Sequence, residues 1–128
     1  MLLDTNALLW LVHDSAKLGS ASREVLQGAG RVHYSSVSVS EITIKHMLGR
    51  IDLPGGDRFP GIFTASGLAE LPFTGTHAAA LLSFPDLARH DPFDRMLLAQ
   101  AESEHLTLLT SDQTLLALGR SWIADARA

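Results

Sequence analysis

Short apolar runs alternate with longer amphipathic segments along the chain. Runs rich in leucine, β-branched and aromatic residues predict strands at residues 2–3, 32–35, 69–71, 106–109 and 121–124. The segments between them predict helices at residues 7–12, 20–27, 37–48, 59–67, 74–83 and 92–101. Because strands alternate with helices and no hairpin signal lies between them, the sequence predicts an α/β fold. Its parallel sheet of about five strands should be covered by helices on both faces.

Capping and loop-forming residues mark the boundaries of these elements. Glycines 28 and 30 end one helix, and residues 54–57 and 85–89 are predicted loops. Asp91 followed by Pro92 gives one helix an N-cap and a favoured first residue. The chain has 128 residues and contains no repeat, low-complexity tract or linker, so residues 1–128 are predicted to form a single domain.

Composition narrows the classes of function. Hydrophobic residues make up 46% of the chain and charged residues 19%, which is enough to form a buried core. The absence of cysteine excludes a disulfide scaffold, a thiol nucleophile and a thiolate metal site. The apolar run 7–12 is too short to cross a membrane and follows no basic region, so we expect a cytoplasmic protein. A net charge of −4 argues against binding nucleic acid through bulk positive potential, but it allows an enzyme that acts through bound cations.

Acidic residues follow two of the predicted strands. Asp4 comes directly after the first strand, and Asp112 follows the fourth. The carboxyl ends of parallel strands share the edge at which open α/β sheets bind ligands. If the strand order is 3-2-1-4-5, which is an assumption at this point, these two side chains meet.

Two further acids lie on otherwise apolar helix faces. Glu41 shares a stripe with Val37, Ile44 and Leu48, and a charge on such a stripe needs a partner. Asp94 lies in the first turn of its helix, on the face that carries the apolar positions 97, 98 and 101. We therefore expect four acids from four separate segments to converge.

Each acid also has an ordinary explanation. Asp4 and Asp112 are acceptable helix N-caps, Asp94 is favoured by the helix dipole, and Glu41 is positioned to pair with Lys45 one turn later. The inference of a shared site therefore depends on all four acids occurring together, not on any one of them. Four crowded carboxylates need a counter-charge, and all-oxygen ligands suit Mg²⁺ or Mn²⁺. Metal-assisted hydrolysis of phosphodiester bonds is the matching chemistry.

The four acidic segments resemble the PIN-domain family, specifically the VapC-type toxins of bacterial toxin–antitoxin modules. The resemblance rests on four segments in family order, Leu2-Leu3-Asp4-Thr5-Asn6, residues 39–45, residues 90–97 and Leu109-Thr110-Ser111-Asp112. It implies a three-layer α/β/α sandwich and an endoribonuclease dependent on Mg²⁺ or Mn²⁺. It also implies RNA as substrate, and a small antitoxin and a second copy of the chain as partners.

By this resemblance the acidic site consists of Asp4, Glu41, Asp94 and Asp112, of which Asp4 and Asp94 are the most dependable metal ligands. Supporting polar positions are Asn6, Thr110 and Asp91, although we favour a capping role for Asp91. Lys45 and Arg95 lie next to site acids, where each either holds substrate phosphate or balances a carboxylate. Arg89 is a further candidate to face RNA.

Several other signals point to packing or to weaker alternatives. The histidines at 13, 33, 46, 77, 90 and 105 lack zinc-binding spacing and are interpreted as surface or packing residues. The apolar residues Trp10, Phe93, Met96 and Leu97 are assigned to the core. An aspartyl phosphate-transfer domain, either a receiver or a haloacid-dehalogenase-like enzyme, fits poorly because Asn6 stands where the latter needs a second aspartate. A catalytically inactive PIN-like binding module remains the non-enzymatic alternative.

Overall fold

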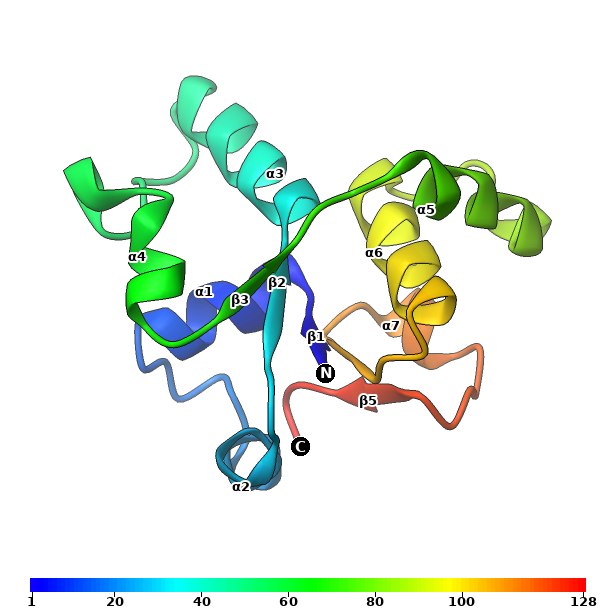
Figure 1. The fold of residues 1–128 in the computed structure, drawn as a ribbon, viewed down its shortest axis with the longest axis horizontal. Coiled ribbons are helices and arrows are strands. Elements are labelled where there is room, and N and C mark those ends of the chain that lie inside the picture. The colour runs from blue at the N-terminus through cyan, green and yellow to red at the C-terminus, as the bar shows by residue number, and fades with distance from the viewer.

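The computed structural model describes residues 1–128 and has a five-stranded parallel sheet at its centre (Figure 1). The strand order is β3-β2-β1-β4-β5, which confirms the assumed order. The strands are short: β1 (Leu2–Leu3), β2 (His33–Ser35), β3 (Ala69–Leu71), β4 (Leu108–Thr110) and β5 (Ile123–Asp125). Because β1 pairs with both β2 and β4, the carboxyl end of β1 lies at the centre of the sheet edge.

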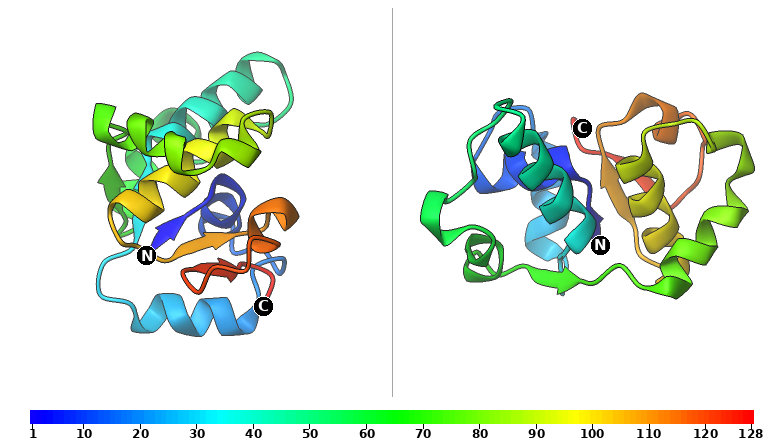
Figure 2. Two further views of the ribbon diagram at one scale, coloured as in Figure 1. Left: turned by 90° about the vertical axis from the view of Figure 1, so that its right-hand side faces the viewer. Right: turned by 90° about the horizontal axis from the view of Figure 1, so that it is seen from above.

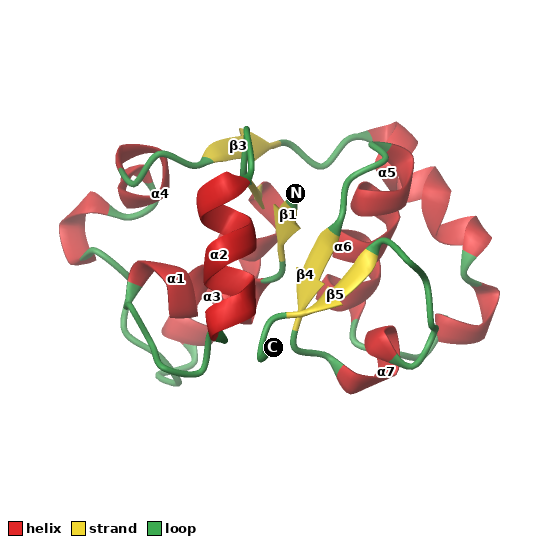
Figure 3. Cartoon of the chain, turned by 90° about the horizontal axis from the view of Figure 1, so that it is seen from below, coloured by secondary structure: helices red, strands yellow, loops and turns green.

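Helices cover both faces of the sheet, as expected for this α/β/α fold. Figure 2 (left) shows α2 and α6 on opposite sides of the strands, and Figure 3 shows α2 nearest the viewer with α6 behind β4 and β5. The helices are α1 (Thr5–Val12), α2 (Ser20–Gly28), α3 (Ser36–Met47), α4 (Gly61–Ala65), α5 (Gly75–Ala79), α6 (Pro92–Ser103) and α7 (Gln113–Leu116). None of them has the length and apolar content needed to span a membrane.

Alternation along the central strands separates two apolar cores. Leu3 and Leu109 belong to a cluster with α1, α3 and α4, whereas Leu2 and Leu108 belong to a cluster with α6 and α7. Neighbouring residues of a strand point to opposite faces, so the all-leucine runs of β1 and β4 contribute to both cores. Leu97 is fully buried, and the aromatic and methionine side chains assigned to the core pack partly buried against the two clusters, namely Trp10, Phe93 and Met96.

The observed elements are shorter than the sequence predicts in some places. The helix expected at 59–67 contains only α4, and the helix expected at 74–83 becomes α5 followed by a 3-10 turn at Ala80–Ser83. Two further 3-10 turns, Gly56–Arg58 and Pro85–Leu87, lie in predicted loops. Strands β4 and β5 begin two residues later than predicted. The short helix α7 was not expected, because its four residues offer too little periodicity to be recognised.

Helix α3 corrects the expectation of a continuous buried stripe. Val37 and Glu41 are buried, but Ile44 is 45% exposed and Leu48 is 62% exposed. Figure 1 shows the physical reason: α3 extends beyond the end of β2, so its second half has no sheet beneath it. The acidic member of the stripe is thus inside the molecule and the last two apolar members are not.

A buried amide connects α6 to the neighbouring strands. Gln100 is fully buried; its Oε1 accepts from the Ser35 hydroxyl, and its Nε2 donates to the Leu71 carbonyl at 3.2 Å. His77 lies beside it, accepts from the Thr74 N–H at 3.0 Å and contacts Glu104 at 2.7 Å. Since buried polar groups are costly unless they are hydrogen-bonded, these contacts favour the observed position of α6 against the sheet.

Candidate metal centre and acidic cavity

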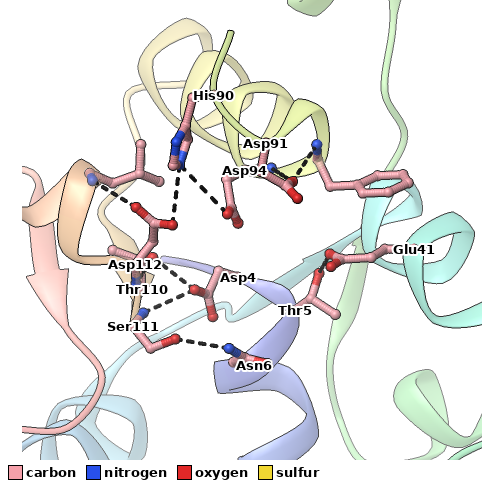
Figure 4. Close-up of polar contacts among 12 residues, drawn as sticks. Asp4, Thr5, Asn6, Glu41, His90, Asp91, Asp94, Thr110, Ser111 and Asp112 are labelled. Atoms are coloured by element: carbon pink, nitrogen blue, oxygen red, sulfur yellow. Dashed lines mark hydrogen bonds and ion pairs between the residues drawn. The ribbon is translucent and has the colours of Figure 1, made fainter. Parts of the chain in front are cut away.

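The four predicted acids come together in one cavity at the carboxyl edge of the sheet (Figure 4). Its volume is about 310 Å³, and none of its eleven lining residues is hydrophobic. The lining residues are Asp4, Thr5, Asn6, Glu41, Lys45, Asp91, Asp94, Ser111, Asp112, Gln113 and Arg127. Residues more than 100 positions apart therefore share a small polar space, as the order of the central strands requires.

Asp4 is the most buried of these acids, with 3% of its surface exposed. It caps α1 by accepting from the Ala7 N–H at 2.7 Å, and its other oxygen accepts from Thr110 Oγ1 at 2.7 Å and the Ser111 N–H at 3.0 Å. Burial raises the pKa of Asp4 above its usual value, although these three hydrogen bonds oppose the shift. Asp4 therefore caps α1 and also lines the acidic cavity.

Glu41 occupies the opposite wall, on α3. It is 7% exposed and accepts a 2.5 Å hydrogen bond from Thr5 Oγ1. Lys45 Nζ lies 2.8 Å from its second oxygen, so the predicted pair one helical turn apart is present. Glu41 is thereby held in the cavity by a hydroxyl and a cation, and Lys45, which is 39% exposed, reaches the opening.

The carboxyl groups of Asp94 and Asp112 lie close enough to change each other's pKa. Burial, a hydrogen bond to Asp112 and the negative charge of that residue raise the pKa of Asp94 to about 8. Burial would also raise the pKa of Asp112, but the Leu115 N–H, Asp94 and His90 together hold it below its usual value. At neutral pH the pair therefore holds one proton, because two ionised carboxylates this close repel each other.

His90 is a site neighbour that the sequence analysis missed. Its Nε2 lies 3.2 Å from Asp112 Oδ2 and 3.9 Å from Asp94 Oδ2 (Figure 4). The sequence analysis interpreted this histidine as a surface or packing residue and did not connect it with the acids. The available signal was its position four residues before Asp94, which places both beside the same helix start.

The supporting polar residues lie where they were expected. Asn6 Nδ2 donates to Ser111 Oγ at 3.1 Å, and Thr110, besides donating to Asp4, accepts from the Asp112 N–H at 3.0 Å. Asp91 caps α6 by accepting from the N–H groups of Phe93 and Asp94, which confirms its favoured capping role. It also lines the cavity.

Of the two cations expected near the site acids, Lys45 lines the cavity and Arg95 does not. The Nε of Arg95 is buried without a hydrogen-bond partner. Arg127, which the sequence analysis did not single out, does line it. Its Nη1 donates to the Ser111 carbonyl at 2.8 Å, and its guanidinium lies 5.4 Å from the centre of the Trp10 ring. The two cavity cations are therefore Lys45 and Arg127.

Backbone contacts place Arg127 beside the cavity. The Ala126 N–H donates to the Thr110 carbonyl at 2.8 Å, and the Gly19 N–H donates to the Ala126 carbonyl at 2.9 Å. Gly19 is needed for this approach, since a Cβ there would lie only 2.1 Å from the backbone carbon of Ala128. No local sequence pattern predicts this contact between Gly19, just before α2, and residues 126–128, which follow it by more than 100 positions.

The donor set fits a hard divalent cation. Carboxylate oxygens are the ligands that Mg²⁺ and Mn²⁺ prefer, and four acids in a small cavity with no apolar lining provide them. The raised pKa values of Asp4 and Asp94 reflect burial and crowding of negative charge, which a bound cation relieves.

Comparison with known proteins agrees with this architecture. The fold is similar to that of a chain in a toxin–antitoxin complex from Klebsiella pneumoniae, with a TM-score of 0.66 and 17% identity over 98% of this chain and 96% of that one. It is also similar to a chain of VapBC2 from Rickettsia felis bound to a promoter DNA fragment, with a TM-score of 0.67 and 14% identity over 96% and 94%. No curated protein matches the sequence. Residues 1–120 match the PIN domain, and the chain belongs to that family.

Proposed function

We propose that this PIN-domain protein is an endoribonuclease that uses Mg²⁺ or Mn²⁺ to hydrolyse RNA phosphodiester bonds. The observation that carries the proposal is the convergence of Asp4, Glu41, Asp94 and Asp112 in one polar cavity. A divalent cation supplies stabilisation of phosphate charge and activation of water. Of the four acids, Asp4 and Asp94 are the principal ligands in this proposal, and Glu41 and Asp112 act directly or through water.

The surrounding residues orient these ligands. Thr110 and the Ser111 N–H hold one oxygen of Asp4, and Thr5 holds one oxygen of Glu41. Asn6 bonds Ser111 and keeps an amide at the cavity wall. Because these partners fix the carboxylates before any ligand binds, little reorganisation is needed when substrate arrives.

We further propose that the chain is the toxin of a toxin–antitoxin pair, with a small antitoxin as partner and a homodimer as its assembly. The similarity of its fold to chains of two toxin–antitoxin complexes supports the antitoxin partner. An antitoxin that covers the cavity would block access of RNA to the acids. For this reason activity has to be measured on protein freed of any co-purified partner.

The direct test is cleavage of RNA by the purified chain. We expect cleavage with Mg²⁺ or Mn²⁺, none with excess chelator, and a loss of about 10²-fold or more in the Asp4→Asn variant, the scale of losing one stabilising group in a reaction centre. Asp57→Asn, which changes an exposed acid outside the cavity, is the matched control and should retain full activity. Full activity of Asp4→Asn would reject the site. A folded wild-type chain that never cuts RNA would favour the inactive binding module.

The cavity cations give a second prediction about substrate binding. Arg127→Ala should raise KM for RNA by about tenfold to a hundredfold with little change in kcat, because a charge-assisted hydrogen bond to phosphate contributes about 1.5–3 kcal/mol. Arg120→Ala removes an exposed arginine outside the cavity and should leave KM unchanged. Steady-state kinetics at fixed salt separates the two parameters. An unaltered KM for Arg127→Ala would show that this arginine only stabilises the Ser111 backbone and Trp10.

A further inference from the structure

The ring of His90 faces two of the cavity carboxylates from the segment that precedes α6 (Figure 4). One possible ligand atom from each of His90, Asp94 and Asp112 lies within 4.8 Å of the other two. We propose that His90 is a metal ligand together with these two aspartates, and that its nitrogen makes this side of the cavity select Mn²⁺ over Mg²⁺. The proposal rests on the proposed function in one respect, that a divalent cation binds in the acidic cavity.

The distances suit coordination of a single ion. Two ligands each about 2.1 Å from an ion, at octahedral or tetrahedral angles, lie about 3.0–3.4 Å apart. The separation of His90 Nε2 from Asp112 Oδ2 is 3.2 Å, and that from Asp94 Oδ2 is 3.9 Å. Only a small movement of Asp94 is therefore needed. The three side chains are 20–22% exposed, so an ion can enter.

The chemistry of the third ligand determines which ion is preferred. Mg²⁺ favours oxygen ligands and retains its waters, whereas imidazole nitrogen is a common ligand of transition-metal ions. A site made only of carboxylates discriminates weakly between Mg²⁺ and Mn²⁺. A nitrogen ligand should add affinity for Mn²⁺ without adding comparable affinity for Mg²⁺.

The competing explanation is that His90 only forms an ion pair with Asp112. In that case a bound cation would have oxygen ligands alone, and the metal preference would not depend on the histidine. Of the six histidines, only His90 lies in a group with two of the cavity carboxylates that could hold a metal ion, so a nitrogen ligand detected on a bound ion can be assigned to it.

Pulsed electron paramagnetic resonance of Mn²⁺ bound to the full chain tests the proposal directly. We expect nitrogen modulation in the wild type, a changed pattern when the protein contains ¹⁵N-labelled histidine, and loss of the modulation in His90→Gln. Calorimetric titration should show that His90→Gln weakens Mn²⁺ binding about tenfold or more, the scale of losing a metal-site interaction, with Mg²⁺ binding altered less than about threefold. His13→Gln, an exposed histidine elsewhere, is the control.

The outcomes separate this inference from the proposed function. Bound Mn²⁺ without nitrogen modulation in the wild type overturns the role of His90 but leaves the acidic nuclease site intact. Nitrogen modulation that responds to histidine labelling, in a protein that never cuts RNA, supports the role of His90 and rejects the nuclease. Absence of any Mn²⁺ binding overturns both. Because the labelling experiment uses the wild type, a His90→Gln variant that fails to fold does not prevent a decision.

Discussion

Replacing Asp94 with asparagine should strongly reduce RNA cleavage while making the metal-free protein more stable. The side chain of Asp94 accepts no N–H hydrogen bond that asparagine would lose, and burial, together with the negative charges of Asp112 and Asp91, already disfavours its charged form. An uncharged amide removes the repulsion but also removes a strong ligand. We expect cleavage to fall by about 10²–10³-fold, and stability at pH 9 to rise by roughly 1–4 kcal/mol, the Coulomb energy of two like charges near a protein surface.

The stability difference should depend on pH in a defined direction. The pKa of Asp94 is about 8 in the folded protein, against a usual value of 3.8, so the folded chain retains a proton that the unfolded chain releases. Metal-free wild type therefore loses stability as pH rises from about 4 to 8, and the variant escapes this loss. Thermal unfolding with chelator, from pH 4 to 9, measures both curves. If the stability of wild type and Asp94→Asn depended on pH in the same way, the extra proton of the folded chain could not be assigned to Asp94.

Metal affinity should rise steeply with pH up to about 8 and then level off. The cation competes with the proton held by Asp94 and Asp112, so apparent affinity should increase about tenfold per pH unit below about pH 7, and about fiftyfold in all from pH 6 to pH 8. Titration calorimetry in two buffers of different ionisation enthalpy should detect release of about one proton per ion at pH 7. Release should be close to none at pH 9.

The same calorimetry can refute this expectation. A flat affinity between pH 6 and 8, with no proton released at pH 7, would mean that the ion avoids the Asp94 and Asp112 pair. The Asp94→Asn variant gives the matched comparison, because it has no titrating carboxyl at that position. Its residual metal binding should show a weaker dependence on pH.

The site residues that could be predicted are those whose position relative to a strand or a helix start is visible in the sequence. Asp4 and Asp112 were placed at the sheet edge because each follows a strand, and the strand order then made them neighbours. Asp94 was recognisable because it stands in the first turn of a helix with a clear cap. These relations depend on alternation, capping and connection rules that act over a few residues.

The parts that were missed depend on contacts between distant segments. His90 meets Asp112 across 22 positions, and Arg127 reaches the cavity because the residues beside it bond to the backbone of Gly19 and Thr110. The two exposed apolar residues of α3 were misassigned for a related reason. Helical spacing reports which residues share a face, but it does not report where the sheet beneath that face ends.

Gln100 has a consequence for the chemistry at the other end of its helix. A slide or turn of α6 about its axis would separate this amide from Ser35 and from the Leu71 carbonyl, so these two hydrogen bonds favour the observed orientation of the helix. Asp94 lies six positions before Gln100 in the same helix, about 9 Å away along the helix axis at the usual rise per residue. The orientation of an ionisable group in the cavity thus depends in part on an uncharged, fully buried side chain that does not line the cavity.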